Sequence, residues 1–176
     1  MDIHIRNAEE KDAETIQKVF YKTWIATYPN EENGISRSDL EHRFHSLLSE
    51  EKIHNVRKLI RELDSTMRFL VIEVDGQIVG VSFLEKEKDH NRFQSVYILP
   101  EYQGQGIGKK AWEYAVSFFD MTKDTVLDVV TYNKKAISFY TKLGFVDTEK
   151  RFSEYKEGME KVAIRPMMEM RLSGKN

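Results

Sequence analysis

Three glycines, Gly104, Gly106 and Gly108, alternate with other residues in one short stretch of the chain. A run of β-favouring residues ends just before this stretch at Pro100, and a helical pattern begins at Ile107. Glycines let the backbone turn tightly and approach a ligand without interference from a Cβ atom. The free N–H groups and the dipole at the start of a helix then attract an anion, most naturally a phosphate. The spacing therefore predicts a phosphate-binding loop.

Two common phosphate-binding patterns do not fit this loop. A P-loop needs glycine where Gln103 stands and Ser or Thr where Lys110 stands, and the dinucleotide pattern needs its third glycine one residue later than Gly108. The residues do match Gln-x-x-Gly-x-Gly, as Gln103, Gly106 and Gly108. This is the pyrophosphate-binding signature of the GNAT acetyltransferases, and the chain resembles that family here. The alternative is a plain strand–helix turn without a ligand.

The resemblance implies acetyl-CoA as the cosubstrate and a particular way of holding it. The strand ending at Leu99 would splay from its neighbour beginning near Thr125, and pantetheine would insert between them, with the backbone of Ile98 and Leu99 pairing with its amides. An N–H near Ile98 would face the thioester oxygen, an interaction typically worth about 3–4 kcal/mol of barrier. The cofactor-binding residues that the resemblance assigns are Ile98, Leu99, Gln103, Gly104, Gln105, Gly106, Ile107, Gly108, Lys109, Asn133 and Tyr140.

A second motif resembles the same family. Residues 130–145 contain Asn133, Ala136, the pair Phe139-Tyr140 and then Gly144-Phe145. Asn133 is placed to cap the helix that follows a strand, and Tyr140 shares the inward face of that helix. We expect Tyr140 to be the general acid that protonates the departing CoA thiolate, since a phenol can donate its proton. The alternative is a core tyrosine with a satisfied hydroxyl.

The group that removes a proton from the amine is not evident from the sequence. Many family members carry a glutamate where this chain has Gln94, and an amide cannot act as a base. The candidates left open are a water chain ending at a backbone carbonyl, Glu85 and Glu87. Direct transfer is the expected mechanism, because the chain has no cysteine and no G-x-S-x-G elbow around its serines.

The acceptor is suggested only weakly. The stretch from Thr23 to Tyr28, with Trp24 and Tyr28, resembles the PaiA-type polyamine N-acetyltransferases. Such rings, with acidic neighbours at Glu31, Glu32 and Asp39, could hold a polyamine by cation–π and charge contacts. The alternative for Trp24 and Tyr28 is an ordinary place in the core at helical spacing.

The elements that must position these residues follow from hydrophobic periodicity. Asp75-Gly76 is a strong hairpin signal, Ser38 is expected to cap the second helix, and Gly144 to end the last one. The predicted helices are a first one from about Ala8 to Tyr28, a second over Leu40–Leu48, a third over Ile53–Leu63, then Ile107–Phe118 and Lys134–Leu143. The predicted strands are Asp2–Arg6, Arg68–Val74, Gln77–Leu84, Phe93–Leu99, Thr125–Thr131, Phe145–Phe152 and Ala163–Leu172.

The resemblance gives this pattern a fold. We expect an α/β (α+β) GNAT fold, in which a central, mixed but mostly antiparallel, twisted sheet of about seven strands has a splayed strand pair and helices on both faces. No repeat, linker or composition shift divides the chain, so residues 1–176 are expected to form a single GNAT acetyltransferase domain.

Composition and charge exclude several classes of binding partner. The net charge of −2 argues against nucleic acid, and no stretch approaches 18 apolar residues, so we expect neither a nucleic-acid nor a membrane partner and a cytoplasmic location. A thiolate metal site is excluded by the absence of cysteine, and His42 and His45 lack a third ligand nearby, so no metal is expected. The resemblance also leaves room for a homodimer, without identifying its surface.

Three functions remain open on the sequence. The first is an acetyltransferase acting on small primary amines, with polyamines leading. The second is a protein N-terminal or lysine acetyltransferase, which would need an open channel between the first helices and the hairpin near residues 152–163. The third is an acyl-CoA-binding sensor without catalysis, which agrees with the presence of Gln94 where many family members have a glutamate.

Overall fold

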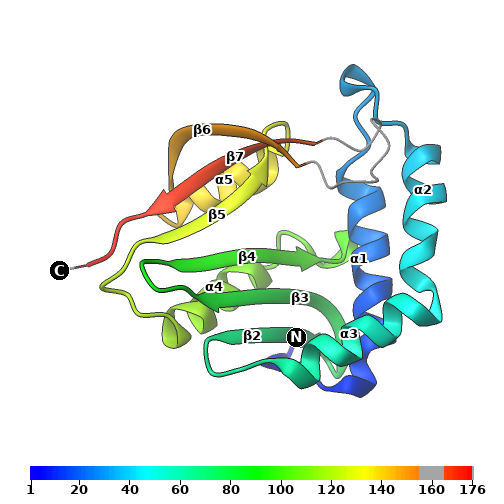
Figure 1. Cartoon of the computed structure of the whole chain (residues 1–176), viewed down its shortest axis with the longest axis horizontal. Helices are drawn as coiled ribbons and strands as arrows, with labels where there is room; N and C mark the ends of the chain where they lie inside the picture. Colours follow the sequence, from blue (N-terminus) through cyan, green and yellow to red (C-terminus); the bar gives the residue numbers. More distant parts are fainter. Residues whose placement is uncertain (155–164, 176) are drawn as a thin grey trace.

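A computed structural model describes residues 1–154 and 165–175 of the chain. Its seven strands form one mixed sheet in the order β1-β2-β3-β4-β5-β7-β6, which confirms the predicted fold class (Figure 1). The channel and hairpin tip expected near residues 152–163 lie largely outside the described residues. The strands are β1 (Ile3–Asn7), β2 (Met67–Val74), β3 (Gln77–Lys86), β4 (Asn91–Ile98), β5 (Thr125–Val130), β6 (Val146–Glu154) and β7 (Arg165–Leu172).

The sheet is split between β4 and β5, the one parallel pair in its order. These strands pair only at Asn91 with Thr125 and Arg92 with Val126. Beyond those two pairs they diverge, as Figure 1 shows, while the strands on either side keep long antiparallel ladders. The expected splayed pair is therefore present, at the expected place.

Helices cover both faces of the sheet. Residues 69–72 of β2 are all buried, which requires cover on each side because successive side chains alternate between faces. In Figure 1, α4 and α5 lie behind the strands, and α1, α2 and α3 gather at the other side. The α-helices are α1 (Ala13–Thr27), α2 (Arg37–His45), α3 (Glu50–Glu62), α4 (Ile107–Phe118) and α5 (Lys134–Lys142), and the 3-10 turns are η1 (Glu10–Asp12), η2 (Glu31–Asn33), η3 (Ser46–Leu48) and η4 (Pro100–Tyr102).

Local turn and cap chemistry sets most element boundaries. Asp75 and Gly76 have φ of 48° and 80°, the left-handed pair that a tight hairpin between β2 and β3 requires. Gly144 follows α5 with φ of 97°, as expected for a helix-ending glycine.

Two boundary predictions were wrong. The cap of α2 is Ser36, whose side chain accepts a hydrogen bond from the Asp39 N–H, and not Ser38, which lies inside the helix. The first helix begins at Ala13 and not near Ala8, because a 3-10 turn at Glu10–Asp12 precedes it.

Candidate active site

The split in the sheet opens into a cleft of about 1370 Å³. Its walls come from β4 and β5, its floor from the loop before α4 and the start of α5, and its far side from the end of α1. The cleft thus lies between two strands of one sheet.

The end of β4 presents its backbone to the cleft. The Leu99 N–H donates to the Val79 carbonyl of β3 at 2.9 Å. Because antiparallel ladder bonds alternate in direction, the N–H of Ile98 points the other way, toward the gap with β5. The Ile98 carbonyl accepts a hydrogen bond from Gln103 Nε2 at 2.9 Å. Of the two predicted backbone contacts, Ile98 therefore offers its N–H to a ligand, whereas the Leu99 N–H is already bonded.

The glycine-rich loop leads directly into the start of α4. Gly104 and Gly106 have φ of 78° and 82°, and Gly106 is the N-cap residue of α4. No side chain caps this helix and its first turn carries no acidic residue, so the N-terminal N–H groups remain available. Lys109, Lys134 and Lys135 line the same part of the cleft. The donors and charges match what a pyrophosphate requires.

The remaining loop residues have other surroundings. Gly108 lies against the Phe139 ring of α5, which a Cβ at this position would approach to 3.1 Å. Ile107 is 1% exposed and packs in the core, and the Gln105 side chain donates to the Glu101 carbonyl at 3.0 Å. The side chains of Gln105 and Ile107 therefore lie outside the cleft.

The second motif supplies one wall of the cleft. Asn133 Oδ1 accepts from the Ala136 N–H at 3.1 Å and caps α5. Tyr140 lines the cleft while its ring packs against Phe93 and Phe145. Burial, and to a smaller extent the nearby Tyr97, raises the pKa of Tyr140 well above its usual value. The phenol therefore stays protonated, as a proton donor must.

The two predicted substrate residues differ in their surroundings. Tyr28 lines the cleft and its hydroxyl lies 3.2 Å from that of Tyr97. The guanidinium of Arg165 lies 4.3 Å from the centre of the Tyr28 ring and occupies the position where a ligand cation would stack. Trp24 packs against Phe44 and does not line the cleft. Its Nε1 is buried without a hydrogen-bond partner among the described residues.

Asp128 is among the cleft residues that sequence reasoning missed. It is the one partly exposed residue of β5 and the sole carboxylate among the described residues that line the cleft. A single charge inside the otherwise apolar run Thr125–Val130 was the available signal. The two carboxylates named from the sequence are engaged elsewhere: Glu85 accepts from Gln94 Nε2 at 2.6 Å and Glu87 from Arg92 Nε at 2.9 Å.

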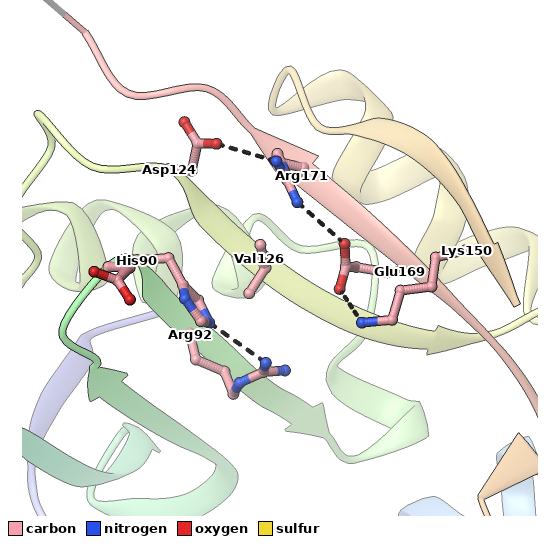
Figure 2. Close-up of a pocket in the computed structure, with 8 residues that line it drawn as sticks. His90, Arg92, Asp124, Val126, Lys150, Glu169 and Arg171 are labelled. Atoms are coloured by element: carbon pink, nitrogen blue, oxygen red, sulfur yellow. Dashed lines mark hydrogen bonds and ion pairs between the residues drawn. The ribbon is translucent and has the colours of Figure 1, made fainter. Parts of the chain in front are cut away.

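A smaller polar pocket of about 370 Å³ lies on the same face, beside the closed end of the split (Figure 2). Its charges satisfy one another. Arg171 reaches Asp124 at 3.4 Å and Glu169 at 3.5 Å, and Lys150 reaches Glu169 at 2.8 Å. These ion pairs link the residue before β5 to β7, and β7 to β6, on that side of the split.

Residues 1–154 and 165–175 contain neither a metal-binding cluster nor a membrane-spanning helix. No group of three or more His, Cys, Asp or Glu side chains is arranged there to hold a metal ion. No helix in these ranges is both long enough and apolar enough to span a lipid bilayer.

Known proteins share these features. A sequence model of the acetyltransferase (GNAT) domain matches residues 65–147. The spermidine N(1)-acetyltransferase of Escherichia coli K12 is 36% identical over an alignment that covers 58% of each chain. The chain therefore matches less than two thirds of the length of this curated relative.

Solved structures extend the likeness to the whole fold. The PaiA N-acetyltransferase of Thermoplasma acidophilum, solved in complex with coenzyme A, superposes with a TM-score of 0.66 at 25% identity and covers 99% of this chain and 100% of its own. A chimera of the Vibrio cholerae spermidine N-acetyltransferase SpeG and hSSAT has a TM-score of 0.61 at 22% identity and covers 98% and 96% of the two chains. With the split sheet, the glycine-rich loop and the capped helix after β5, these matches show that the chain is similar in sequence and fold to the GNAT acetyltransferases.

Proposed function

We propose that this protein is an N-acetyltransferase that moves an acetyl group from acetyl-CoA directly onto a primary amine. The observation that carries the proposal is the cleft through the sheet, which has an anion site at one end, a backbone N–H and a phenol in its walls, and an opening toward α1 at the other end. A thioester and an amine that enter from opposite faces would meet inside it. The PaiA structure solved with coenzyme A supports this reading.

The residues present fit acetyl-CoA, and each has a definite task. Acetyl-CoA supplies a thioester carbonyl for the amine to attack. The N–H groups at the start of α4, with Lys109 and the two lysines of α5, would bind phosphate. The Ile98 N–H would stabilise negative charge on the carbonyl oxygen, and Tyr140 would give its proton to the leaving sulfur.

Direct transfer is the simplest mechanism for this set of residues. The chain has no cysteine, so no thiol can carry the acetyl group. Ser95 and Ser138 line the cleft, but neither lies in a nucleophile elbow. The amine itself is therefore the nucleophile.

Among amines, we propose polyamines as the leading acceptors. The spermidine acetyltransferase relative and the PaiA structure support this choice, and so does the carboxylate of Asp128 in a cleft that an ammonium group must enter. The aromatic rings support it less than the sequence suggested, because the Arg165 guanidinium lies over the rings of Tyr28 and Trp24 and Trp24 does not line the cleft. Protein N-termini, lysine side chains and non-catalytic binding are the alternatives that an experiment must separate.

The test combines binding with turnover. Acetyl-CoA is titrated into the protein by calorimetry, and thiol release is then followed with spermidine, spermine, simple monoamines, amino acids and N-terminal peptides. Binding with rapid release on polyamines is the expected result. Release on peptides alone would replace the acceptor class, and binding without release on any amine would favour the sensor. A protein that does not bind acetyl-CoA would overturn the proposal.

A further inference from the structure

The proposed reaction requires a base, and the described cleft has one candidate. A primary ammonium has a pKa near 10, so at neutral pH it must lose a proton before it attacks. Gln94 lines the cleft but cannot accept that proton. Glu85 and Glu87 do not line the cleft and are bonded to Gln94 and Arg92. Among the described residues, Asp128 is the carboxylate that remains.

The strand register places Asp128 at the point where the sheet opens. The last paired residues of β4 and β5 are Arg92 and Val126. Two residues further along each strand, where the strands no longer pair, stand Gln94 and Asp128, and both line the cleft. β4 is irregular at Gln94, because its neighbours Phe93 and Ser95 pair with the consecutive residues Leu84 and Phe83 of β3. The carboxylate absent from position 94 thus stands across the split at position 128.

Asp128 is held in place and still accessible. Its Oδ2 accepts from Arg92 Nη1 at 3.1 Å, whereas Oδ1 has no hydrogen-bond partner among the described residues. The side chain is 33% exposed and faces the cleft. One oxygen is therefore anchored and the other is free to accept a proton.

We infer that Asp128 is the general base of the acetyl transfer, an assignment that rests on the proposed function. The ammonium group of the acceptor gives one proton to Asp128 Oδ1, and the neutral amine forms the new C–N bond as the C–S bond breaks. Tyr140 protonates the departing sulfur. A second proton leaves the nitrogen and replaces the phenol proton, and Asp128 returns its own to solvent, so that one proton is released per turnover.

The surroundings of Asp128 suit this role. Burial raises its pKa above the usual value for Asp; Arg92 on β4 lowers it, Glu169 on β7 raises it and Lys150 on β6 lowers it, with a net rise. A raised pKa brings a carboxylate closer to neutral pH, where a base works best. Figure 2 shows that Glu169 contacts Lys150 and Arg171 and that Arg92 lies beside His90, so the charges around Asp128 are themselves partnered.

The test is the substitution Asp128→Asn, which keeps an oxygen to accept from Arg92 and removes the base. We expect kcat/KM at pH 7 to fall by roughly 10²–10⁴-fold, the usual contribution of a general base. The wild-type value should be nearly constant between the pKa of Asp128 and that of the amine. The variant value should instead rise about tenfold per pH unit, because the enzyme must then wait for free amine. Calorimetry should show unchanged acetyl-CoA affinity.

Two control substitutions and one rescue substitution test whether the effect of Asp128→Asn is specific to the carboxylate at position 128. Asp124→Asn removes a carboxylate four residues earlier on the same face, which pairs with Arg171 in the smaller pocket, and should leave the pH profile unchanged. Glu85→Gln removes the carboxylate bonded to Gln94 and should also leave it unchanged. Asp128→Glu should restore the flat profile at reduced kcat, and it serves as the working variant if Asp128→Asn does not fold.

Three results would overturn the assignment. One is a wild-type pH profile in the folded Asp128→Asn variant. Another is a raised KM for polyamines alone with unchanged kcat, which would make Asp128 an ammonium anchor. The third is loss of the flat profile in Glu85→Gln. In each of these three outcomes the wild type still transfers acetyl groups, so the proposed function stands. A wild type that is inactive on every amine would contradict both the proposed function and the assignment of Asp128.

Discussion

At the residue scale, Tyr140 combines a place in the core with a place at the cleft. Its ring is 7% exposed and packs edge-on against Phe93 and Phe145, yet the hydroxyl has no hydrogen-bond partner among the described residues. Burial explains both the rigid placement of the ring and the raised pKa that keeps the phenol protonated. Both alternatives drawn from the sequence, core packing and proton donation, are therefore compatible in one side chain.

The substitution Tyr140→Phe distinguishes the role of Tyr140 in core packing from its role as a proton donor. The ring and its packing remain, so the melting temperature and acetyl-CoA affinity should change little, while kcat should fall by roughly 10²-fold or more through loss of the acid. Tyr114→Phe, a tyrosine on α4 that does not line the cleft, is the control and should retain wild-type kcat. Steady-state kinetics measures kcat, and calorimetry measures the affinity for acetyl-CoA. Undiminished kcat would show that another group protonates the sulfur.

At the element scale, β4 is positioned by a glycine on its neighbour. Gly80 of β3 lies opposite Ile98, and a Cβ at this position would stand 2.8 Å from the Tyr97 carbonyl oxygen. That oxygen belongs to the backbone, so β4 itself would have to move. The close approach therefore sets where the Ile98 N–H points.

We expect Gly80→Ala to lower both stability and acetyl-CoA affinity. Overpacking of this kind typically costs about 1–3 kcal/mol, and the displaced N–H would meet the thioester poorly. Gly76→Ala is the matched control, because φ of 80° strains the hairpin while nothing lies within 4 Å of the new Cβ. It should lose stability with unchanged affinity in urea denaturation and calorimetry. Equal affinity losses in both variants would contradict the role of Gly80.

A second element-scale feature is an ion cluster that joins β1, η1 and β2. Arg6 contacts Asp12 and Glu73 at 2.7 Å each, and Asp12 also accepts from the Glu9 N–H at 2.8 Å. Burial alone would raise the pKa of Asp12, but the hydrogen bonds from Arg6 and Glu9 outweigh it and the pKa lies below its usual value. The cluster therefore stabilises the fold when Asp12 is ionised.

We expect Asp12→Ala to reduce the free energy of unfolding by about 3–5 kcal/mol at pH 7, as for other buried pairs that lose one partner. Since the folded pKa is lowered, this stabilisation is complete above the unfolded pKa of about 3.9 and is lost as pH falls through the folded value. The difference between wild type and variant should thus shrink in urea titrations below pH 4. Glu14→Ala, which breaks an exposed pair with Lys18, should have little effect at either pH. A pH-independent loss in Asp12→Ala would instead indicate lost packing.

At the scale of the whole molecule, the sheet consists of two parts joined at two residue pairs. Strands β1 to β4 form one part and β5, β7 and β6 the other. Past Arg92 and Val126 the facing edges of β4 and β5 no longer pair with each other. A ligand with amide groups could bridge these edges and complete the sheet.

We expect acetyl-CoA to stabilise the protein in a localised way. A hundredfold excess over Kd should add about 2.7 kcal/mol to the free energy of unfolding. Amide hydrogen exchange should slow most in residues 95–98 and 127–130, where strand edges are open, and least in the β2–β3 hairpin, which lies away from the split and keeps a long antiparallel ladder. Exchange measured with and without the ligand checks this. Protection limited to the hairpin would mean that the ligand does not bind in the split.

The sequence by itself determined features that depend on neighbouring residues. The hairpin at Asp75-Gly76, the cap at Asn133 and the glycine after α5 follow from local backbone chemistry, which needs no distant partner. The glycine-rich loop belongs to the same class, because a strand, a turn and a helix start are contiguous in the chain. For this reason the fold class and the position of the glycine-rich loop at the start of α4 could be predicted from the order of the residues.

Only the tertiary structure decided what depends on long-range packing. Asp128 reads as an isolated charge in a buried strand until the register with β4 places it across the split from Gln94. Trp24 and Tyr28 are alike in sequence spacing and both lie under Arg165, yet packing leaves Tyr28 buried at the cleft and Trp24 partly buried against Phe44, outside the cleft lining. Such contacts join segments that lie far apart in the sequence. Their geometry follows from how the elements pack together, which no local pattern contains.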